Sequence, residues 1–259
     1  MDGLLVLITG ASAGIGEAAA RRFAAEGADL VLWARRQGRL AALAEELRAA
    51  QDVVVHTAGV DVRDRSAVAE AAAHMLREIG TPDLLLNNAG LASGLSLLHE
   101  GDPEDWDRMI DTNLKGLLNV TRAVLPAMVE RGTGHVINIG STAGHQVYPK
   151  GNVYNATKFG VKALTEAMNL DVAGTGVRVS SVDPGFVETE FSVVRFHGDE
   201  ERAEAVYEGF EPLSADDVAD VVAFVATRPP HVNVHDVVLL PTAQRNVYVL
   251  DREEKSDAG

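Results

Sequence analysis

Leu4–Gly27 reads LLVLITGASAGIGEAAARRFAAEG: a β-rich run, a glycine turn and a helix-like segment. The unbroken run Leu4–Gly10 is typical of a strand buried on both faces of a parallel sheet. Gly10, Gly14 and Gly16 lead into the helix-like part, where a helix N-terminus presents backbone N–H groups to a phosphate. The spacing is not the strict G-x-G-x-x-G fingerprint. The stretch still predicts a nucleotide-binding strand–turn–helix unit.

The same turn also fits the G-x-S-x-G elbow of serine hydrolases, since Ser12 stands between Gly10 and Gly14. In α/β-hydrolases an earlier strand already carries an oxyanion loop, whereas this elbow would lie on the first strand of the chain. The hydrolase interpretation is therefore disfavoured.

Strand-like and helix-like patterns alternate along the rest of the chain. This predicts an α/β fold, a single Rossmann domain over residues 1–250 with a doubly wound parallel sheet of about seven strands and helices on both faces. Ser214 with Asp217 predicts a capped helix over 214–227. Residues 251–259, DREEKSDAG, predict a flexible acidic tail. The further strands are expected at 28–36, 53–57, 83–90, 134–144, 177–184 and 234–241.

Composition excludes several classes of function. The 259 residues contain no cysteine, which excludes disulfides, thiol nucleophiles and zinc–thiolate sites. A net charge of −15 argues against nucleic acid or an anionic membrane as partner. Leu4–Ile8 is too short for a signal peptide or a membrane span, so a cytoplasmic location is expected. His231 and His235 lie in an extended stretch, too far apart for one ion, and no metal is predicted.

Two features point to the adenosine half of a dinucleotide. Arg35 and Arg36 end the second predicted strand, where an acid would accept from a 2′-hydroxyl and arginine suits a 2′-phosphate. They favour NADP over NAD, the alternative being a basic start to the next helix, which also carries Arg39. Asp61 can accept from an adenine amino group or cap the helix that starts near Arg63-Asp64.

STAGHQVYPKGNVYNATK, residues 141–158, brings together groups that can move a proton. If a helix begins near Val153, Tyr154 and Lys158 lie one turn apart on one face. A phenol has a pKa near ~10, and a nearby cation favours the phenolate. Ser141 can donate a hydrogen bond to the reacting oxygen. Taken alone, Tyr-x-x-x-Lys is typical of an ordinary helix face.

Four features in order change that interpretation: Thr9-Gly10-x3-Gly14-x-Gly16, Asn87-Asn88-Ala89-Gly90, Ser141 and Tyr154-x3-Lys158. Together they resemble the short-chain dehydrogenase/reductase family over nearly the whole chain. The resemblance implies an enzyme acting on CH–OH groups, with Ser141, Tyr154, Lys158 and Asn113 as catalytic residues. It implies that Lys158 lowers the pKa of Tyr154 and binds the cofactor ribose, and that Asn113 binds a water of the proton relay. The implied cofactor-binding residues are Gly10, Ser12, Gly14, Ile15, Gly16, Arg35, Arg36, Asp61, Val62, Asn88, Tyr154, Lys158, Pro184, Gly185, Val187 and Thr189.

A closer resemblance covers about residues 3–248 and includes EFSVVRFHGD in a substrate lid at about 188–212. It is to the NADP-dependent 3-hydroxy acid dehydrogenases, which include serine and L-allo-threonine dehydrogenases and malonic semialdehyde reductases. It implies NADP, a small 3-hydroxy acid oxidised at C3 (serine, L-allo-threonine, 3-hydroxypropionate or 3-hydroxyisobutyrate) and a homotetramer. The acid's carboxylate needs a cation. Arg195 is the first candidate and Lys150 its rival, unless Arg195 pairs with Glu188 or Glu190.

Two other functions remain open at this point. A general NADPH-dependent carbonyl or ketoacyl reductase would share every catalytic residue. A non-catalytic NADP-binding regulator would keep the glycine turn and lose Ser141, Tyr154 or Lys158, and all three are present.

Overall fold

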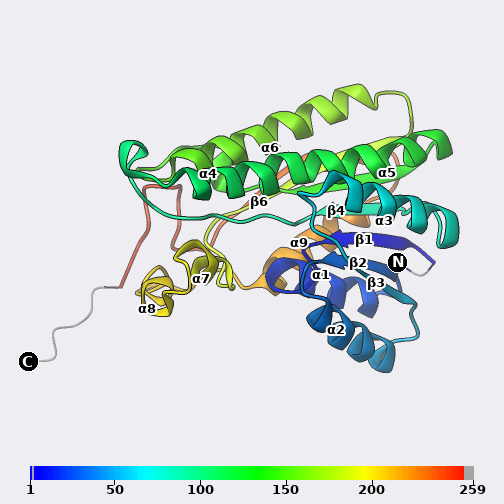
Figure 1. The fold of residues 1–259 in the computed structure, drawn as a ribbon, viewed down its shortest axis with the longest axis horizontal. Coiled ribbons are helices and arrows are strands. Elements are labelled where there is room, and N and C mark those ends of the chain that lie inside the picture. Colours follow the sequence, from blue (N-terminus) through cyan, green and yellow to red (C-terminus); the bar gives the residue numbers. More distant parts are fainter. Residues whose placement is uncertain (2, 254–259) are drawn as a thin grey trace, which may run out of the picture.

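The computed structural model describes residues 1 and 3–253 of the chain. Its centre is one seven-stranded sheet in the order β3-β2-β1-β4-β5-β6-β7, and every neighbouring pair is parallel (Figure 1). The predicted doubly wound Rossmann fold is confirmed. The strands are β1 Leu5–Thr9, β2 Asp29–Ala34, β3 Val55–Gly59, β4 Leu84–Asn87, β5 Gly134–Ile139, β6 Val177–Pro184 and β7 Asp236–Leu239.

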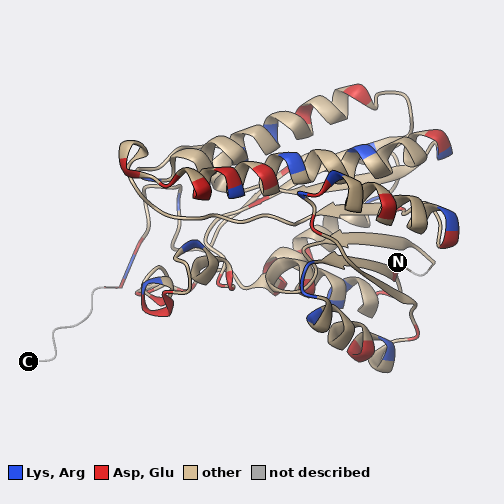
Figure 2. Ribbon diagram, in the orientation of Figure 1, with Lys and Arg blue, Asp and Glu red and all other residues tan. Residues whose placement is uncertain are grey.

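Helices cover both faces of the sheet (Figure 1). One apolar core joins α1 (Gly14–Ala25), α2 (Gln37–Ala50) and α9 (Ala215–Ala226) to the strands. A second core joins α3 (Arg65–Glu78), α5 (Leu117–Arg131) and α6 (Asn152–Asp171) to the opposite face. The charged residues lie mostly on these helices and the loops (Figure 2). Burial on both faces explains why the central strands are continuous apolar runs.

The order of the strands fixes where a ligand can bind. The chain runs from β1 outward to β3, then returns to β4 on the other side of β1. Between β1 and β4 the loops that follow the two strands diverge to opposite faces, which leaves a crevice at the carboxyl edge of the sheet. The glycine turn after β1 and the Asn-Asn-Ala-Gly turn after β4 both open at this edge.

Some boundaries differ from the sequence prediction. The third strand begins at Val55, two residues later than expected, because Leu30 of β2 pairs with Val55 and the N–H of Val54 turns to Asp29. The predicted capping box at Ser214 and Asp217 is present at the start of α9. No helix in the described part is long and apolar enough to cross a bilayer.

The segment predicted as a lid leaves the domain and returns at one point. Val187 pairs with Leu213 in an isolated bridge, and the Glu188 N–H donates to the Leu213 carbonyl. Between them lie two short helices, α7 (Phe191–Arg195) and α8 (Glu200–Glu204). We call residues 188–212 the lid segment.

Residues 251–253, the start of the segment predicted as a flexible tail, make defined contacts. Arg252 donates to the Val206 carbonyl and lies over the Phe210 ring, and the Glu253 N–H donates to Gly209. Residues 251–253 therefore pack on the lid segment, because a guanidinium can satisfy carbonyls there while it stacks on an aromatic ring. The remainder, residues 254–259, lies outside the described residues.

Candidate active site

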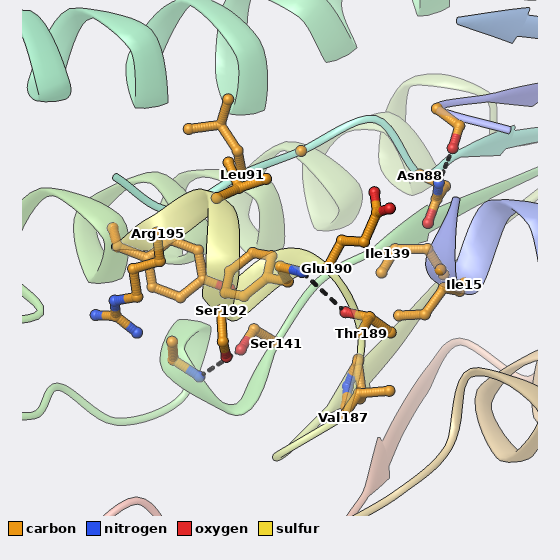
Figure 3. Close-up of a pocket in the computed structure, with 18 of the residues that line it drawn as sticks. Ile15, Asn88, Leu91, Ile139, Ser141, Val187, Thr189, Glu190, Ser192 and Arg195 are labelled. Atoms are coloured by element: carbon orange, nitrogen blue, oxygen red, sulfur yellow. Dashed lines mark hydrogen bonds between the residues drawn. The ribbon is translucent and has the colours of Figure 1, made fainter. Parts of the chain in front are cut away.

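One cavity of about 620 Å³ opens at the carboxyl edge of the sheet and gathers nearly all the predicted site residues (Figure 3). The glycine turn lines one end, Ser141 and Tyr154 line the middle, and Arg195 of the lid segment lines the other end. Two predicted residues, Gly16 and Asn113, are not in the lining. They act behind it, as described below. The predicted residues in the lining are Gly10, Ser12, Gly14, Ile15, Arg35, Arg36, Asp61, Val62, Asn88, Ser141, Tyr154, Lys158, Pro184, Gly185, Val187, Thr189 and Arg195.

The glycine turn is a backbone cradle. Gly10 and Gly14 have positive φ angles of 67° and 55°, which side-chain-bearing residues rarely adopt. No side chain caps the first turn of α1, so its N–H groups remain available for a phosphate. A Cβ on Gly16 would lie 2.4 Å from Asn88 Nδ2 and 2.5 Å from the Gly10 carbonyl oxygen. The turn therefore fits the diphosphate of a dinucleotide, with Gly16 as a packing residue.

Asn88 ties this turn to the end of β4. Its side-chain amide donates to the Thr9 carbonyl at 2.9 Å, and its own N–H donates to Thr9 Oγ1 at 3.1 Å. These bonds fix the distance between the two loops at the crevice. Asn88 is predicted to lie on the side of the sheet that binds the cofactor ribose. The hydrogen bonds to Thr9 are compatible with that position.

The end of the cavity predicted to bind the adenosine carries the arginines. Arg35 and Arg36 follow β2 and line the cavity, and Arg36 Nε donates to Ser12 Oγ at 3.2 Å. Asp61 also lines the cavity and accepts from Arg63, whose hydrogen bond lowers the pKa of the Asp61 carboxyl. The alternative that Asp61 caps α3 is wrong. Asp64 is the cap, because its carboxylate accepts from Ser66 and Ala67 N–H groups.

Helix α6 places Tyr154 and Lys158 one turn apart, with Lys158 Nζ 5.9 Å from the centre of the Tyr154 ring. Both side chains are buried. Burial lowers the pKa of Lys158 to about 8, although Asp183 acts to raise it. Burial raises the pKa of Tyr154 above its ordinary value, and Tyr148 adds to the rise. Two titratable groups of shifted pKa in one cavity mark a functional site.

The structure adds a second cation beside Tyr154, and the expected effect of Lys158 on the pKa of Tyr154 stays a prediction. In this structure Ser141 and the guanidinium of Arg195 lower the pKa of Tyr154. The Lys158 ammonium donates to the Ile139 carbonyl at 2.9 Å. Arg195 Cζ lies 5.7 Å from the centre of the Tyr154 ring, about as close as Lys158 Nζ at 5.9 Å.

Asn113 lies in a π-helical turn (η2, Asp111–Gly116) between α4 (Pro103–Ile110) and α5. Its amide donates to the Leu91 carbonyl and to Thr157 Oγ1, and its oxygen accepts the Leu91 N–H. A Cβ on Gly90 would meet both Asn113 Oδ1 at 3.3 Å and Lys158 Nζ at 3.9 Å. Asn113 thus lies close behind Lys158, and π-helical turns often occur at functional sites.

Arg195 ends α7 and points into the far end of the cavity (Figure 3). Its Nη2 donates to the Tyr148 hydroxyl at 2.9 Å, and its Nε donates to the Gly94 carbonyl at 3.4 Å. The alternative pairing with Glu188 or Glu190 is not what the structure shows, because Glu190 pairs with Arg36 and Arg39. The rival cation, Lys150, lines a small neighbouring pocket instead.

Asp183 is a buried carboxyl group close to the predicted catalytic residues Tyr154 and Lys158. Its carboxylate accepts from His145 Nε2 at 2.5 Å and from the Ser181 hydroxyl, and burial raises its pKa. Lys162 donates to His145 Nδ1 at 2.9 Å and lies 3.6 Å from Asp236. His145, Asp183 and Asp236 have the atom types and spacing of a metal site, but Lys162 supplies positive charge there.

Comparison with known proteins now identifies the family. A family model for short chain dehydrogenases matches residues 4–200. The chain belongs to the short-chain dehydrogenase family. The predicted membership and the prediction of an oxidoreductase are confirmed.

Among curated members of the short-chain dehydrogenase family, the NADP-dependent 3-hydroxy acid dehydrogenase YdfG of Salmonella typhi is 49% identical over 242 residues, covering 93% of this chain and 96% of that protein. Sulfoacetaldehyde reductase 2 of Chromohalobacter salexigens is 47% identical over 251 residues, covering 96% and 99%. A solved closed form of serine dehydrogenase complexed with NADP+ superposes with a TM-score of 0.90 at 44% identity, covering 97% and 100%.

Sequence reasoning did not find three residues that this short-chain dehydrogenase places at the site. Tyr148 holds Arg195, and Phe191 packs edge-on against Tyr154 with ring centres 5.7 Å apart. Glu190 binds the arginines of the adenosine end. Tyr148 lies in an irregular loop and gave no signal. Glu190 and Phe191 stand directly after Thr189, so their position in the lid segment could have marked them.

Proposed function

We propose that this short-chain dehydrogenase transfers hydride between NADP(H) and C3 of a small 3-hydroxy acid, or reduces the corresponding semialdehyde. The observation that carries the proposal is the guanidinium of Arg195, held by Tyr148 5.7 Å from the Tyr154 ring. A fixed cation at that distance suits a substrate whose anion is only a few bonds from its hydroxyl. The NADP-dependent 3-hydroxy acid dehydrogenase and the serine dehydrogenase among the relatives support it.

The residues present fit NADP. The cradle at Gly10, Gly14 and Ser12 would hold the diphosphate. Gly10 has no room for a side chain, because a Cβ there would lie 2.9 Å from Ala89, so the backbone of the turn faces the cavity uncovered. Arg35 and Arg36 would hold the 2′-phosphate, for which a guanidinium is suited by geometry and permanent charge. Bound there, the nicotinamide supplies the hydride acceptor or donor.

Three residues would handle the proton in the oxidising direction. Tyr154 as phenolate would take the hydroxyl proton, while Ser141 would donate a hydrogen bond to the same oxygen. Lys158, with its pKa lowered to about 8, is suited to exchange a proton near neutral pH. Asn113 would hold a water beside Lys158 and connect it to solvent.

Arg195 would then have two effects. It would bind the carboxylate of the acid by charge-assisted hydrogen bonds. It would also stabilise the phenolate of Tyr154, whose pKa burial raises. Fixing the acid between Arg195 and Ser141 would orient the reacting carbon.

The test is the Tyr154→Phe variant together with a substrate panel. The variant loses the transferable proton and keeps the ring, so turnover should vanish while NADPH fluorescence titration still reports binding. Substantial remaining turnover would exclude Tyr154 as the acid–base group. The panel follows NADPH absorbance with serine, L-allo-threonine, 3-hydroxypropionate and 3-hydroxyisobutyrate.

Two additions to the panel separate the alternatives. Sulfoacetaldehyde carries a sulfonate, which the same guanidinium can bind, and a relative of this chain is named for its reduction. A keto ester carries no charge, and its rapid reduction with no oxidation of hydroxy acids would favour a general carbonyl reductase. NADPH binding with no turnover of any compound would favour a regulator.

Assembly and location follow from the resemblance alone. We propose a homotetramer in the cytoplasm. Phe224 of α9 and Val238 of β7 are about half exposed, at 50% and 49%, which suits burial by a second copy. Sedimentation equilibrium measures the assembly directly, and a monomeric mass would refute the tetramer.

A further inference from the structure

Glu190 links the lid segment to Arg36 and Arg39, which follow β2. Its two carboxylate oxygens accept separately: Oε2 from Arg36 Nη1 at 2.8 Å, and Oε1 from Arg39 Nη1 at 2.6 Å. Glu190 and Arg36 are 154 positions apart in the chain. The two hydrogen bonds lower the pKa of Glu190, so the carboxylate is ionised at neutral pH. The negatively charged Glu190 carboxylate of the lid segment therefore pairs with the guanidinium groups of Arg36 and Arg39.

The same Arg36 is the residue that would read a 2′-phosphate. It lines the cavity and donates to Ser12 of the phosphate turn. A carboxylate and a phosphate both accept bidentate hydrogen bonds from arginine. A phosphate monoester carries about −1.5 to −2 charges at neutral pH, more than one carboxylate. Glu190 and a 2′-phosphate would thus compete for Arg36, and their like charges would repel.

The ion pairs are weak enough to exchange. The side chains of Arg36, Arg39 and Glu190 are 44%, 52% and 45% exposed. Exposed ion pairs contribute little to stability because water screens them. Binding of a phosphate can therefore displace Glu190 without disrupting the fold.

Displacement would release one end of α7 only. Glu190 directly precedes the helix and Arg195 ends it. Figure 3 shows the two side chains pointing in different directions within the cavity. The other end stays attached, since the Gly94 N–H donates to the Arg195 carbonyl at 2.9 Å and His197 bonds Asp105 at 3.2 Å.

We propose that Glu190 is a specificity-determining residue that couples recognition of the 2′-phosphate to the lid segment. With the phosphate absent, Glu190 binds Arg36 and Arg39 and fastens α7. A 2′-phosphorylated adenosine takes Arg36, leaves Glu190 only its bond to Arg39 and so loosens the start of α7. A nucleotide with a 2′-hydroxyl leaves the contact in place. The inference rests on the proposed use of NADP, and it concerns binding rather than the identity of the oxidised substrate.

The first experiment is calorimetric titration of Glu190→Gln with NADP+, NAD+, adenosine 2′,5′-bisphosphate and 5′-AMP. Removing the competitor should tighten binding of the two 2′-phosphorylated ligands by up to about 5-fold, which corresponds to about 1 kcal/mol, the upper end of the range for an exposed ion pair. Binding of NAD+ and 5′-AMP should not change. Glu188→Gln is the matched control, because it removes the same charge two residues away on an exposed side chain.

Three results would overturn the proposal. Unchanged or weaker binding of NADP+ by Glu190→Gln would mean that Glu190 does not compete for Arg36. An equal gain in Glu188→Gln would reduce the effect to net charge. An equal gain for NAD+ would remove the link to the 2′-phosphate. None of these results depends on turnover, so they are distinct from failure of the substrate panel.

Hydrogen exchange tests the coupling to the lid segment. Adenosine 2′,5′-bisphosphate should speed amide exchange in residues 190–195 of the wild type, and 5′-AMP should not. In Glu190→Gln the exchange should already be fast and unaffected by the bisphosphate. If saturating bisphosphate leaves exchange in the wild type unchanged, α7 is not fastened by Glu190 and the coupling is refuted.

Discussion

Arg195→Ala separates the two effects that we propose for one guanidinium, binding of the substrate's carboxylate and stabilisation of the Tyr154 phenolate. The side chain donates to Tyr148 and Gly94 and lies 5.7 Å from the Tyr154 ring centre. Hydrogen bonds to a charged group contribute about 1.5–3 kcal/mol. Without the guanidinium, the bonds from Arg195 to the substrate's carboxylate are lost. This should lower kcat/KM for 3-hydroxypropionate by about 10- to 150-fold, mainly through KM. For 1,3-propanediol, which has the same carbon chain and no charge, the loss should be much smaller.

The same variant should change the pH profile. Arg195 favours the phenolate, so its removal raises the pKa of Tyr154 further. Oxidation requires the phenolate, and its rate therefore rises with pH through that pKa. In Arg195→Ala the rising limb of kcat should move to higher pH for both substrates, measured from NADPH absorbance at saturating NADP+.

Arg202→Ala is the control. Arg202 also belongs to the lid segment but stacks on Phe196, with 4.3 Å between Cζ and the ring centre. It should leave the ratio of kcat/KM between the acid and the diol at the wild-type value. The reasoning is refuted if Arg195→Ala lowers kcat/KM equally for the acid and the diol, or leaves the KM for serine and 3-hydroxypropionate unchanged.

Two further predictions concern cofactor binding and stability. Gly16→Ala would place a Cβ 2.4 Å from Asn88 Nδ2, so NADP+ should bind at least tenfold more weakly in calorimetry, and wild-type affinity would contradict the packing argument. Burial, and next Arg178, lowers the pKa of His135 to about 3, so the folded state keeps it neutral. The unfolded chain takes up that proton below pH ~6.5, and stability falls as pH decreases from there. By pH 5 this lowers the free energy of unfolding by about 2 kcal/mol. Measured by urea unfolding, His135→Leu should therefore be more favourable by about 2 kcal/mol at pH 5 than at pH 8. An equal effect of the substitution at both pH values would exclude the linkage.

Much of the site could be predicted because the relevant residues are fixed by local backbone geometry. A phosphate turn needs glycine where φ is positive, and Gly10 and Gly14 meet that need at 67° and 55°. Tyr154 and Lys158 face one way because both lie on α6. The parallel sheet then brings these local features to one edge without further information from the sequence.

Side-chain pairing across long distances in sequence could not be predicted in the same way. Arg195 had two candidate acceptors within its own segment, Glu188 and Glu190, and Lys150 in the loop before Tyr154 was its rival as the cation for the substrate. The structure selects Tyr148, 47 positions away. Lys158 likewise donates to Ile139 rather than facing the phenol oxygen, since that carbonyl is the acceptor within reach at 2.9 Å. Such choices depend on where the loops lie, which no local pattern encodes.

The short helix α7 brings these long-range contacts together. It spans five residues, about 7.5 Å at the usual rise of 1.5 Å per residue. Glu190, just before it, touches the arginines that suit a 2′-phosphate, and Arg195, at its end, touches Tyr148 beside the reacting groups. Because the Arg195 carbonyl stays bonded to the Gly94 N–H, release of Glu190 should loosen the start of α7 and leave the guanidinium at Tyr148. The Glu190→Gln variant should therefore change the affinity for NADP+ and leave the KM for the acid near the wild-type value, and a changed KM would show that the two ends of α7 move together.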